Sequence, residues 1–308
     1  MRDIDLKTLR LLVSVCDFRN MTRAAEHENI EPSAISKRIA QLEADLQTPL
    51  LNRTRRGVYP TDAGLAVLEH ARRVLFTLDQ IADEAATFSS GVKGHVRVVA
   101  SASAIAEYLP DDLTSFMRHP SNRNIRVDIE ERSSLELVRQ VREGMASIGV
   151  CWDRVELQGL AHRRYRQDRL ALAVHPDHPL ACKKSLKFDQ TLDYEHVGLP
   201  PSSAVNQMLG RAAARTGRKI AYRVFVSNFD SAFRVVAANL GISIVPVEIG
   251  GPYAKMRKIK IIPLTDAWTV RRFIVCFADY DGLQAATKRM VDHLVQAAAD
   301  NAGLNRQE

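Results

Sequence analysis

The sequence predicts a helical N-terminal region, then one long helix, then an α/β region. Three observations support this order. Apolar residues recur at helical spacing up to about residue 47, residues 65–89 contain no Gly or Pro, and short β-rich segments alternate with helical ones from His95 onward. At 308 residues the chain is long enough for two or three domains.

Composition excludes several classes of protein. Hydrophobic residues at 46 % and charged residues at 26 % are typical of soluble proteins, and no long uncharged apolar run is present. Asp3 and Asp5 are atypical of a secretory signal, so we expect a cytoplasmic protein. The cysteines are scattered without metal-ligand spacing, so we expect no disulfide, no metal and no cofactor. They are Cys16, Cys151, Cys182 and Cys276.

The net charge of +7 invites a nucleic-acid interpretation. Residues 1–90 carry a net charge of −1, however, and residues 91–308 carry +8. Bulk charge therefore does not locate a nucleic-acid site, and the local placement of cations has to do so.

The N-terminal region reads as short helices. Apolar residues at helical spacing predict a first helix from Asp5, which the segment Phe18-Arg19-Asn20 interrupts. Asn20 is suited to cap a short second helix through Glu26. Pro32 is suited to the first position of a third helix that ends near Gln47.

The third helix has two different faces. Its apolar residues are spaced four, three and four apart, namely Ile35, Ile39, Leu42 and Leu46. Its other face carries Ser33, Ser36, Lys37 and Gln41. A short helix, a tight turn and a second helix with a polar, basic face form a helix-turn-helix, whose second helix enters the major groove. A generic three-helix bundle is the alternative.

A basic hairpin is predicted after these helices. Two short apolar runs within residues 49–61 flank Arg53-Thr54-Arg55-Arg56-Gly57, and Gly57 can adopt a positive φ. Beside a recognition helix such a hairpin is a wing, with Arg53, Arg55 and Arg56 on phosphates or in the minor groove. A solvated charged turn is the alternative.

The long helix runs from a cap at Thr61-Asp62 to about Ser89. Its apolar stripe comprises Leu65, Leu68, Leu75, Leu78, Ile81, Ala85 and Phe88. The small preceding region offers this stripe no core of its own, so we expect the helix to pack on a second copy in a dimer. Packing on the following region is the alternative.

The remaining chain alternates strands and helices, which indicates a parallel α/β sheet. Predicted strands span 95–100, 125–131, 147–150, 169–174, 220–226, 242–245 and 271–277. Predicted helices span 104–118, 135–143, 204–216, 229–239 and 283–299.

Several spaced motifs now stand in order: Leu6-Lys7-Thr8-Leu9-Arg10, Met21-Thr22-Arg23-Ala24-Ala25-Glu26, Ser33-Ala34-Ile35-Ser36-Lys37-Arg38-Ile39, Pro49-Leu50-Leu51-Asn52-Arg53 and Thr61-Asp62-Ala63-Gly64. Over about 60 residues they resemble the LysR-type family of transcriptional regulators. The segments His178-Pro179-Leu180-Ala181 and 239–246 resemble landmarks of that family's effector domain.

The resemblance implies DNA binding by the helix-turn-helix and the wing. The residues that we expect at DNA are Thr22, Arg23, Pro32, Ser33, Ser36, Lys37, Arg53, Arg55 and Arg56. It also implies a homotetramer, a dimer of dimers on an inverted-repeat promoter site. Glu31-Pro32 stands where the family often has Ser-Gln, which removes a candidate base-reading side chain, so the operator cannot be copied from relatives.

The resemblance further implies a domain order. Residues 1–60 would form the winged helix-turn-helix domain, 61–90 the linker and dimerisation helix, and 91–308 an effector-binding domain similar to periplasmic solute-binding proteins. Its two α/β lobes, joined by two crossover strands, would be 92–164 with 267–300 and 165–266. Effector binding would change lobe closure and, through the tetramer, the bend in the DNA.

The effector is expected where strands end and helices begin, because free backbone N–H groups there favour anions. This rule selects Ser101, Ala102, Ser103, Arg132, Ser133, Trp152, Ser202 and Ser203. Hydroxyls and an arginine favour a small carboxylate or a similar anion. Alternatively, the serines are only helix caps, Arg132 pairs with Glu131 or Glu136, and Trp152 belongs to the core.

The sequence offers little support for two other functions. An α/β-cleft enzyme is not expected, because GxGxxG, Walker, GxSxG and HExxH motifs are absent and His175, His178 and His196 have no evident nucleophile or ligand partner. A thiol-based redox-sensing regulator would use Cys182, whose thiolate Lys183 and Lys184 could stabilise.

Overall fold

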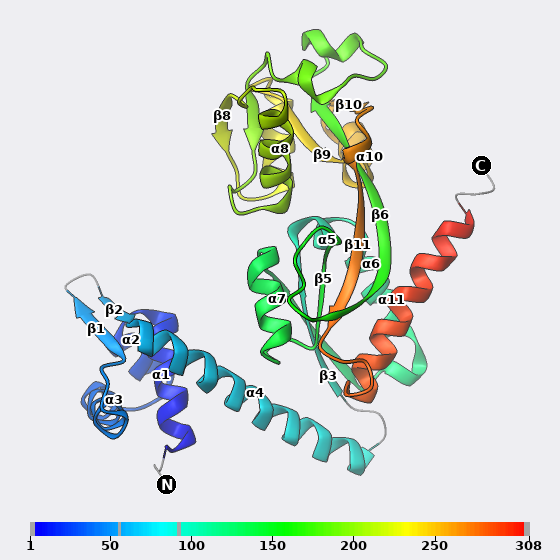
Figure 1. Cartoon of the computed structure of the whole chain (residues 1–308). Coiled ribbons are helices and arrows are strands. Elements are labelled where there is room, and N and C mark those ends of the chain that lie inside the picture. Colours follow the sequence, from blue (N-terminus) through cyan, green and yellow to red (C-terminus); the bar gives the residue numbers. More distant parts are fainter. Residues whose placement is uncertain (1–3, 55–56, 91–93, 305–308) are drawn as a thin grey trace. The chain divides into compact units, whose positions relative to one another are not determined.

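A computed structural model describes residues 4–54, 57–90 and 94–304 of the chain (Figure 1). The chain divides into two compact units. The first holds residues 1–90 with 143–145, and the second holds residues 91–142 and 146–308. Separate hydrophobic clusters form the interior of each unit.

The first unit is a helical cluster with a hairpin beside it. α1 (Leu6–Phe18), α2 (Met21–His27) and α3 (Pro32–Leu46) enclose a core in which Leu12 and Ile35 are fully buried. These helices begin and end where the sequence predicts, and the helix-turn-helix is confirmed.

Local chemistry sets the helix ends. The Asp5 carboxylate accepts a hydrogen bond from the backbone N–H of Thr8 at 2.9 Å, which caps α1. Arg19 and Gln47, with φ values of 51° and 54°, end α1 and α3 in the left-handed conformation. Pro32 occupies the start of α3, where its missing N–H costs nothing.

The predicted wing is an antiparallel pair of strands, β1 (Leu51–Thr54) and β2 (Gly57–Pro60). The Glu43 carboxylate on α3 accepts hydrogen bonds from the N–H groups of Leu50 at 2.7 Å and Leu51 at 3.0 Å, so α3 anchors the first strand. Gly57 has a φ of 129°, and a Cβ there would lie 2.7 Å from the Arg19 carbonyl oxygen. Arg55 and Arg56 lie outside the described residues.

α4 (Asp62–Ser90) is the predicted long helix. A Cβ at Gly64 would lie 1.9 Å from the carbonyl oxygen of Leu50, so only glycine lets the helix start this close to the wing. Leu68 is buried in the core of the first unit, whereas Leu65 and Ile81 are 53 % and 58 % exposed. Part of the apolar stripe is therefore left uncovered in this single chain.

The second unit contains two lobes built on a mixed sheet (Figure 1). In the first lobe β3 (Gly94–Ala100) pairs in parallel with β4 (Ile125–Glu131) and β5 (Ile148–Trp152). The helices of this lobe are α5 (Ala102–Ala106), α6 (Leu109–Arg118), η1 (Pro120–Asn122), α7 (Ser134–Arg142) and α11 (Ala285–Leu304).

In the second lobe β9 (Ser243–Pro246) and β10 (Lys260–Pro263) pair antiparallel with β6 (Ala161–Val174). A separate parallel pair joins β7 (His196–Gly198) to β8 (Tyr222–Phe225). The helices of this lobe are η2 (Pro179–Cys182), η3 (Phe188–Thr191), α8 (Ala204–Arg215), α9 (Phe229–Ala237) and α10 (Val247–Arg257), and η4 (Ala267–Thr269) follows β10.

β6 and β11 (Val270–Phe277) are the crossover strands that join the lobes (Figure 1). The first half of β6 pairs antiparallel with β11, which also pairs with β5. The second half of β6 pairs with β9 and β10. The two-lobed α/β fold is confirmed, and one strand pair carries the chain out of the first lobe and back.

Some sequence predictions for this unit were wrong. The single helix over 104–118 is two helices, because Pro110 cannot lie in a helix interior and instead starts α6. The sheet is mixed because both crossover strands run antiparallel to their neighbours. β6 begins at Ala161 rather than 169, since its first half is polar and lacks an apolar run. β7, β10 and α10 were missed, being very short or, in α10, interrupted by Pro252.

A buried guanidinium ties the crossover strands together. Arg271 on β11 lies opposite Asp168 on β6, and its Nε donates to Asp168 Oδ1 at 2.9 Å. Its Nη atoms donate to Ser103 Oγ at 3.0 Å and Glu107 Oε1 at 3.2 Å. Burial and the neighbouring Asp168 carboxylate raise the pKa of Glu107, so Glu107 is neutral and Asp168 balances the charge of Arg271.

Replacing this guanidinium should destabilise the second unit. Arg271→Met leaves the Asp168 carboxylate buried without a cation, which should lower the free energy of unfolding by about 3–5 kcal/mol. Urea unfolding of the whole chain, followed by tryptophan fluorescence, measures this, because Trp152 and Trp268 both belong to the second unit. Arg272→Met, at the exposed neighbouring position, is the control. Equal stability of the two variants would contradict a structural role for the buried network.

His196 is a second buried polar group, in β7. Its Nδ1 lies 3.1 Å from the Tyr194 carbonyl oxygen and its Nε2 lies 3.2 Å from Thr191 Oγ1. Its ring packs between Phe188 and Tyr222. Burial lowers the pKa of His196 to about 4, so the folded chain holds the neutral imidazole.

The stability of the chain should therefore depend on His196 in mildly acid solution. In the unfolded chain His196 has a pKa of about 6.5, so on acidification it is protonated at a higher pH than in the folded chain. Its contribution to the free energy of unfolding is therefore fully present above about pH 6.5 and is lost as the pH falls toward 4. Between pH 7 and pH 5 the His196 contribution to the free energy of unfolding should fall by about 2 kcal/mol. His196→Gln should remove this part of the pH dependence in urea unfolding, whereas His162→Gln, on an exposed side chain, should keep it.

Candidate functional site

The first unit presents a polar surface on α3. Ile35 and Ile39 fix the buried side of the helix, so Ser33 and Lys37 are exposed and Ser36 is half-buried on other sides. Short hydroxyls and one cation on a helix of 15 residues are groups that can meet base edges and phosphates in a major groove.

The wing adds a cation to the same surface. Arg53 on β1 donates from Nη1 to Ser36 Oγ at 3.0 Å, so the fold joins two predicted DNA-binding residues that are 17 positions apart. This hydrogen bond holds the Arg53 guanidinium next to the Ser36 hydroxyl. The polar side of α3 therefore continues onto the wing.

The start of α2 contributes two further predicted residues. The Asn20 side chain accepts hydrogen bonds from the N–H groups of Thr22 at 2.9 Å and Arg23 at 3.1 Å. Both side chains are exposed, and the Arg23 guanidinium lies 5.6 Å from the centre of the Phe18 ring. This cap holds Thr22 and Arg23 at the first turn of α2 and leaves their exposed side chains as the groups that can contact DNA.

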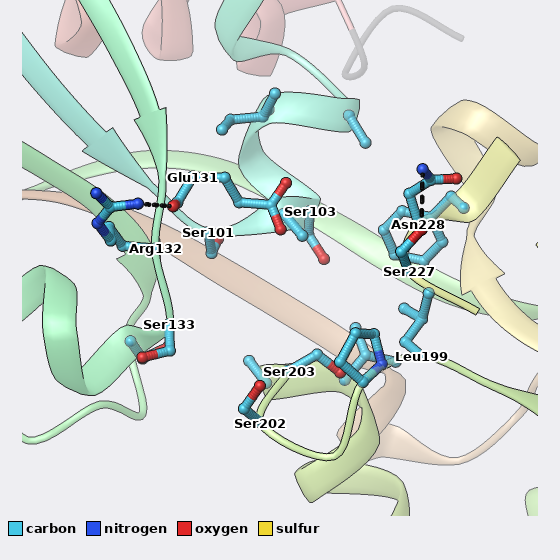
Figure 2. A pocket seen from close by; sticks show the side chains of 18 of the residues that line it. Ser101, Ser103, Glu131, Arg132, Ser133, Leu199, Ser202, Ser203, Ser227 and Asn228 are labelled. Atoms are coloured by element: carbon cyan, nitrogen blue, oxygen red, sulfur yellow. Dashed lines mark hydrogen bonds between the residues drawn. The ribbon is translucent and has the colours of Figure 1, made fainter. Parts of the chain in front are cut away.

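The second unit contains a pocket of about 460 Å³ between its lobes (Figure 2). Serines line it from both sides: Ser101, Ser103, Ser133, Ser134, Ser202, Ser203 and Ser227. Ile105, Ile249 and Tyr253 add an apolar wall. A cavity of this size with convergent hydroxyls is typical of a site for a small polar molecule.

Helices α7, α8 and α9 begin at this pocket, where Ser133, Ser203 and Asn228 precede their first residues. Ser203 Oγ accepts from the Asn206 N–H at 3.2 Å, and Asn228 Oδ1 accepts from the Ser231 N–H at 2.9 Å. The first N–H groups of a helix have no partner within the helix. The pocket therefore receives several backbone donors that favour an anionic group.

Buried hydroxyls add to this donor set. Ser101 Oγ and Ser134 Oγ are buried and have no hydrogen-bond partner among the described residues. A buried hydroxyl without a partner is costly, and a ligand or a water molecule in the pocket would satisfy it. Ser103 differs, because its hydroxyl accepts from Arg271 and so connects the pocket to the buried crossover network.

The fold brings most of the predicted effector residues together. Those that line the pocket are Ser101, Ala102, Ser103, Arg132, Ser133, Ser202 and Ser203. The Arg132 guanidinium, however, donates to the Glu131 carbonyl oxygen at 3.0 Å (Figure 2). It also pairs with the Glu130 carboxylate. Trp152 does not line this pocket but a separate hollow of the second unit.

Sequence reasoning missed several lining groups. Ser227 and Asn228 follow β8, so the strand-end rule that selected the serines also applies to them. The Glu131 carboxylate points into the pocket and has no partner in the described part of the chain (Figure 2). Hydrogen bonds from Ser133 hold the pKa of Glu136 below its ordinary value, so Glu136 is ionised at neutral pH.

The described residues show no metal site and no membrane-spanning helix. They contain no group of three or more His, Cys, Asp or Glu side chains able to hold a metal ion. None of their helices combines the length and the apolar character needed to cross a membrane. All four cysteines are free, and only Cys182 is exposed, with its Sγ donating to the Pro179 carbonyl oxygen at 3.3 Å.

Both parts of the chain match family models. Residues 6–65 match the model described as "Bacterial regulatory helix-turn-helix protein, lysR family". Residues 89–299 match the model "LysR substrate binding domain". The second match alone covers more than half of the chain and includes every residue that lines the pocket.

Individual similar proteins are consistent with both family matches. The "Probable cat1 operon transcriptional activator" of Acinetobacter lwoffii is 29 % identical over 252 residues, which cover 79 % of this chain and 80 % of that protein. The crystal structure of full-length CbnR complexed with its target DNA has a TM-score of 0.72 at 23 % identity, covering 96 % of this chain and 100 % of that one. The effector binding domain of QuiR in complex with shikimate has a TM-score of 0.59 at 15 % identity, covering 68 % and 99 %.

The helix-turn-helix with its wing, the two-lobed α/β unit and both family models lead to one conclusion. The chain belongs to the LysR family and is a DNA-binding transcriptional regulator with an effector-binding domain.

Proposed function

We propose that this regulator senses a small hydroxylated carboxylate in the serine-lined pocket and transmits its binding to promoter DNA, without catalysing a reaction. The observation that carries the proposal is the convergence of hydroxyls and helix N-termini on one pocket of about 460 Å³. The protein works in the cytoplasm, as a homotetramer built from two dimers.

The chemistry of the pocket defines the class of effector. The start of α8, with the unsatisfied N–H groups of Ala204 and Val205, suits a carboxylate. Ionised Glu136 and the unpartnered Glu131 carboxylate are acceptors, which suit ligand hydroxyl groups rather than a second negative charge. The complex of the similar QuiR effector binding domain with shikimate supports a small-molecule ligand for this fold.

Signal transmission would follow from the crossover strands. A ligand held by Ser101 of the first lobe and Ser203 of the second favours one degree of lobe closure, because it contacts both. The uncovered stripe of α4, with Leu65 and Ile81 exposed, supports self-association through this helix. A change in lobe closure would then alter the packing of the tetramer and the bend of the bound DNA.

The DNA arm of the proposal is tested by fluorescence anisotropy. Duplex from upstream of the protein's own gene should bind about a thousandfold more tightly than scrambled duplex at matched salt. Equally weak binding to both duplexes would contradict an operator at that position.

Two substitutions should distinguish a residue that contacts phosphates from a residue that contacts base edges. Arg53→Gln should weaken binding to every duplex and lower the slope of log affinity against log salt by about 1, because one phosphate contact is lost. Ser36→Ala should instead change the preference among operator variants. Arg118→Gln, an exposed arginine of the second unit, is the control and should change neither quantity. A uniform effect of Ser36→Ala on all sequences would argue against base reading.

The effector arm is tested with a panel of small carboxylates, shikimate included, and their methyl esters. We expect at least one acid to raise the melting temperature of the protein while its ester does not. Ser101→Ala should weaken the response about tenfold in ligand concentration, since it removes an unpartnered buried hydroxyl without disturbing a hydrogen bond of the fold. Ser121→Ala, on an exposed hydroxyl, is the control. Equal stabilisation by acids and esters would contradict the anionic class.

A further inference from the structure

A second hollow of about 490 Å³ lies elsewhere in the second unit, and the regulator function does not account for it. Its lining differs in character from the serine-lined pocket. The residues that define it are Trp152, Arg154, Arg211, Arg215, Trp268 and Arg272.

The register of β5 and β11 brings together the residues on one side of the hollow. Trp152, the last residue of β5, lies opposite Phe273 on β11, which puts it beside Arg272. The chain then turns, and the Asp153 N–H donates to the Arg272 carbonyl oxygen at 2.9 Å. This hydrogen bond holds the turn that carries Arg154 against β11. Arg154 and Arg272, far apart in sequence, are thus neighbours at one rim.

Helix α8 supplies the opposite side. Arg211 and Arg215 are one helical turn apart, so both side chains project from the same face. Met208 and Ala212 on that face are buried, which fixes the orientation of the helix. Trp268, in η4 between β10 and β11, lines the hollow and packs edge-on against Phe188 at 5.3 Å between ring centres.

The arginines of this hollow are unpaired, in contrast to others of the same unit. Arg163, Arg218 and Arg223 each form an ion pair with a nearby carboxylate. No carboxylate within the described ranges pairs with Arg154, Arg211, Arg215 or Arg272, although Asp153 also lines the hollow. Like charges one turn apart on a helix destabilise each other. Four guanidinium groups around one concave surface therefore repel one another, and an anion bound between them would relieve that repulsion.

The tryptophans indicate what else the anion carries. Both indole rings line the hollow and are only half-buried, so their remaining surface is available for contact. Indole faces stack on flat rings, and guanidinium groups bind phosphate oxygens in a bidentate manner. A phosphate joined to a planar base satisfies both kinds of group.

We propose that this hollow is a second ligand site, which binds a nucleoside monophosphate or a closely similar phosphorylated flat ring. The guanidinium groups hold the phosphate and the indoles contact the ring. α8 connects this site to the serine-lined pocket, because Ser203, Ala204 and Val205 at its start line the pocket while Arg211 and Arg215 near its end line the hollow. A ligand bound in either site would therefore contact the helix that lines the other site as well.

The chain provides its own probe for this site. It contains two tryptophans, Trp152 and Trp268, and both line the hollow. Titration of the whole protein with adenosine monophosphate, with excitation at the red edge of tryptophan absorption where adenine does not absorb, should give saturable quenching. Adenosine and inorganic phosphate should each act only at about tenfold or more higher concentration, because each lacks one half of the contacts.

Variants distinguish quenching by a bound nucleotide from collisional quenching by free nucleotide in solution. Arg211→Gln with Arg215→Gln should shift the quenching midpoint upward about tenfold or more, since charged hydrogen bonds to the phosphate are lost while the helix keeps good helix formers. The control is Arg118→Gln with Arg123→Gln, which removes the same charge from exposed positions of the same unit and should leave the midpoint unchanged. Quenching by adenosine at the same midpoint, an unchanged midpoint in the first variant, or no saturable signal up to about 1 mM would each overturn the proposal.

Discussion

The two-lobed unit depends on one buried charge. Arg271 is 2 % exposed, and the cost of removing a guanidinium from water is met only while Asp168, Ser103 and Glu107 all remain in place. Asp168 stands directly opposite on the partner crossover strand, so the ion pair fixes the register of the strands that both lobes share. Ser103 lies in α5 and Glu107 directly follows it, so the same charge also fixes this helix at the edge of the serine-lined pocket.

In the first unit, contacts to the backbone of the wing fix the wing in place. The Glu43 carboxylate receives the N–H groups at the start of β1, and the absence of a side chain at Gly64 lets α4 approach the Leu50 carbonyl oxygen. Together they set the wing relative to α3, which allows Arg53 to reach Ser36. The relative position of Ser36 and Arg53, both predicted to bind DNA, thus depends on contacts made by other residues.

The two concave surfaces of the second unit share α8 and differ in electrostatics. The serine-lined pocket uses neutral donors, hydroxyls and helix N-termini, and its one lining arginine is engaged with Glu130. The hollow beside Trp152 uses full cations. Neutral donors in a partly closed cavity discriminate by geometry, whereas clustered guanidinium groups select for charge. One helix therefore contributes residues to two concave surfaces of different electrostatic character.

The sequence by itself determined the features that depend on neighbours along the chain. Helix spacing and caps predicted α1 to α4, and the rule that ligands meet strand ends and helix starts selected five of the serines that line the pocket but not Ser134 or Ser227. Both signals lie within a few residues of one another in the sequence. Only the tertiary structure decided the partners of charged and aromatic side chains. Arg132 turned to Glu130, Trp152 joined the second hollow, and Arg154 met Arg272 across 118 positions of sequence. The physical reason is that strand register and helix packing bring such groups together, and neither leaves a local pattern in the sequence.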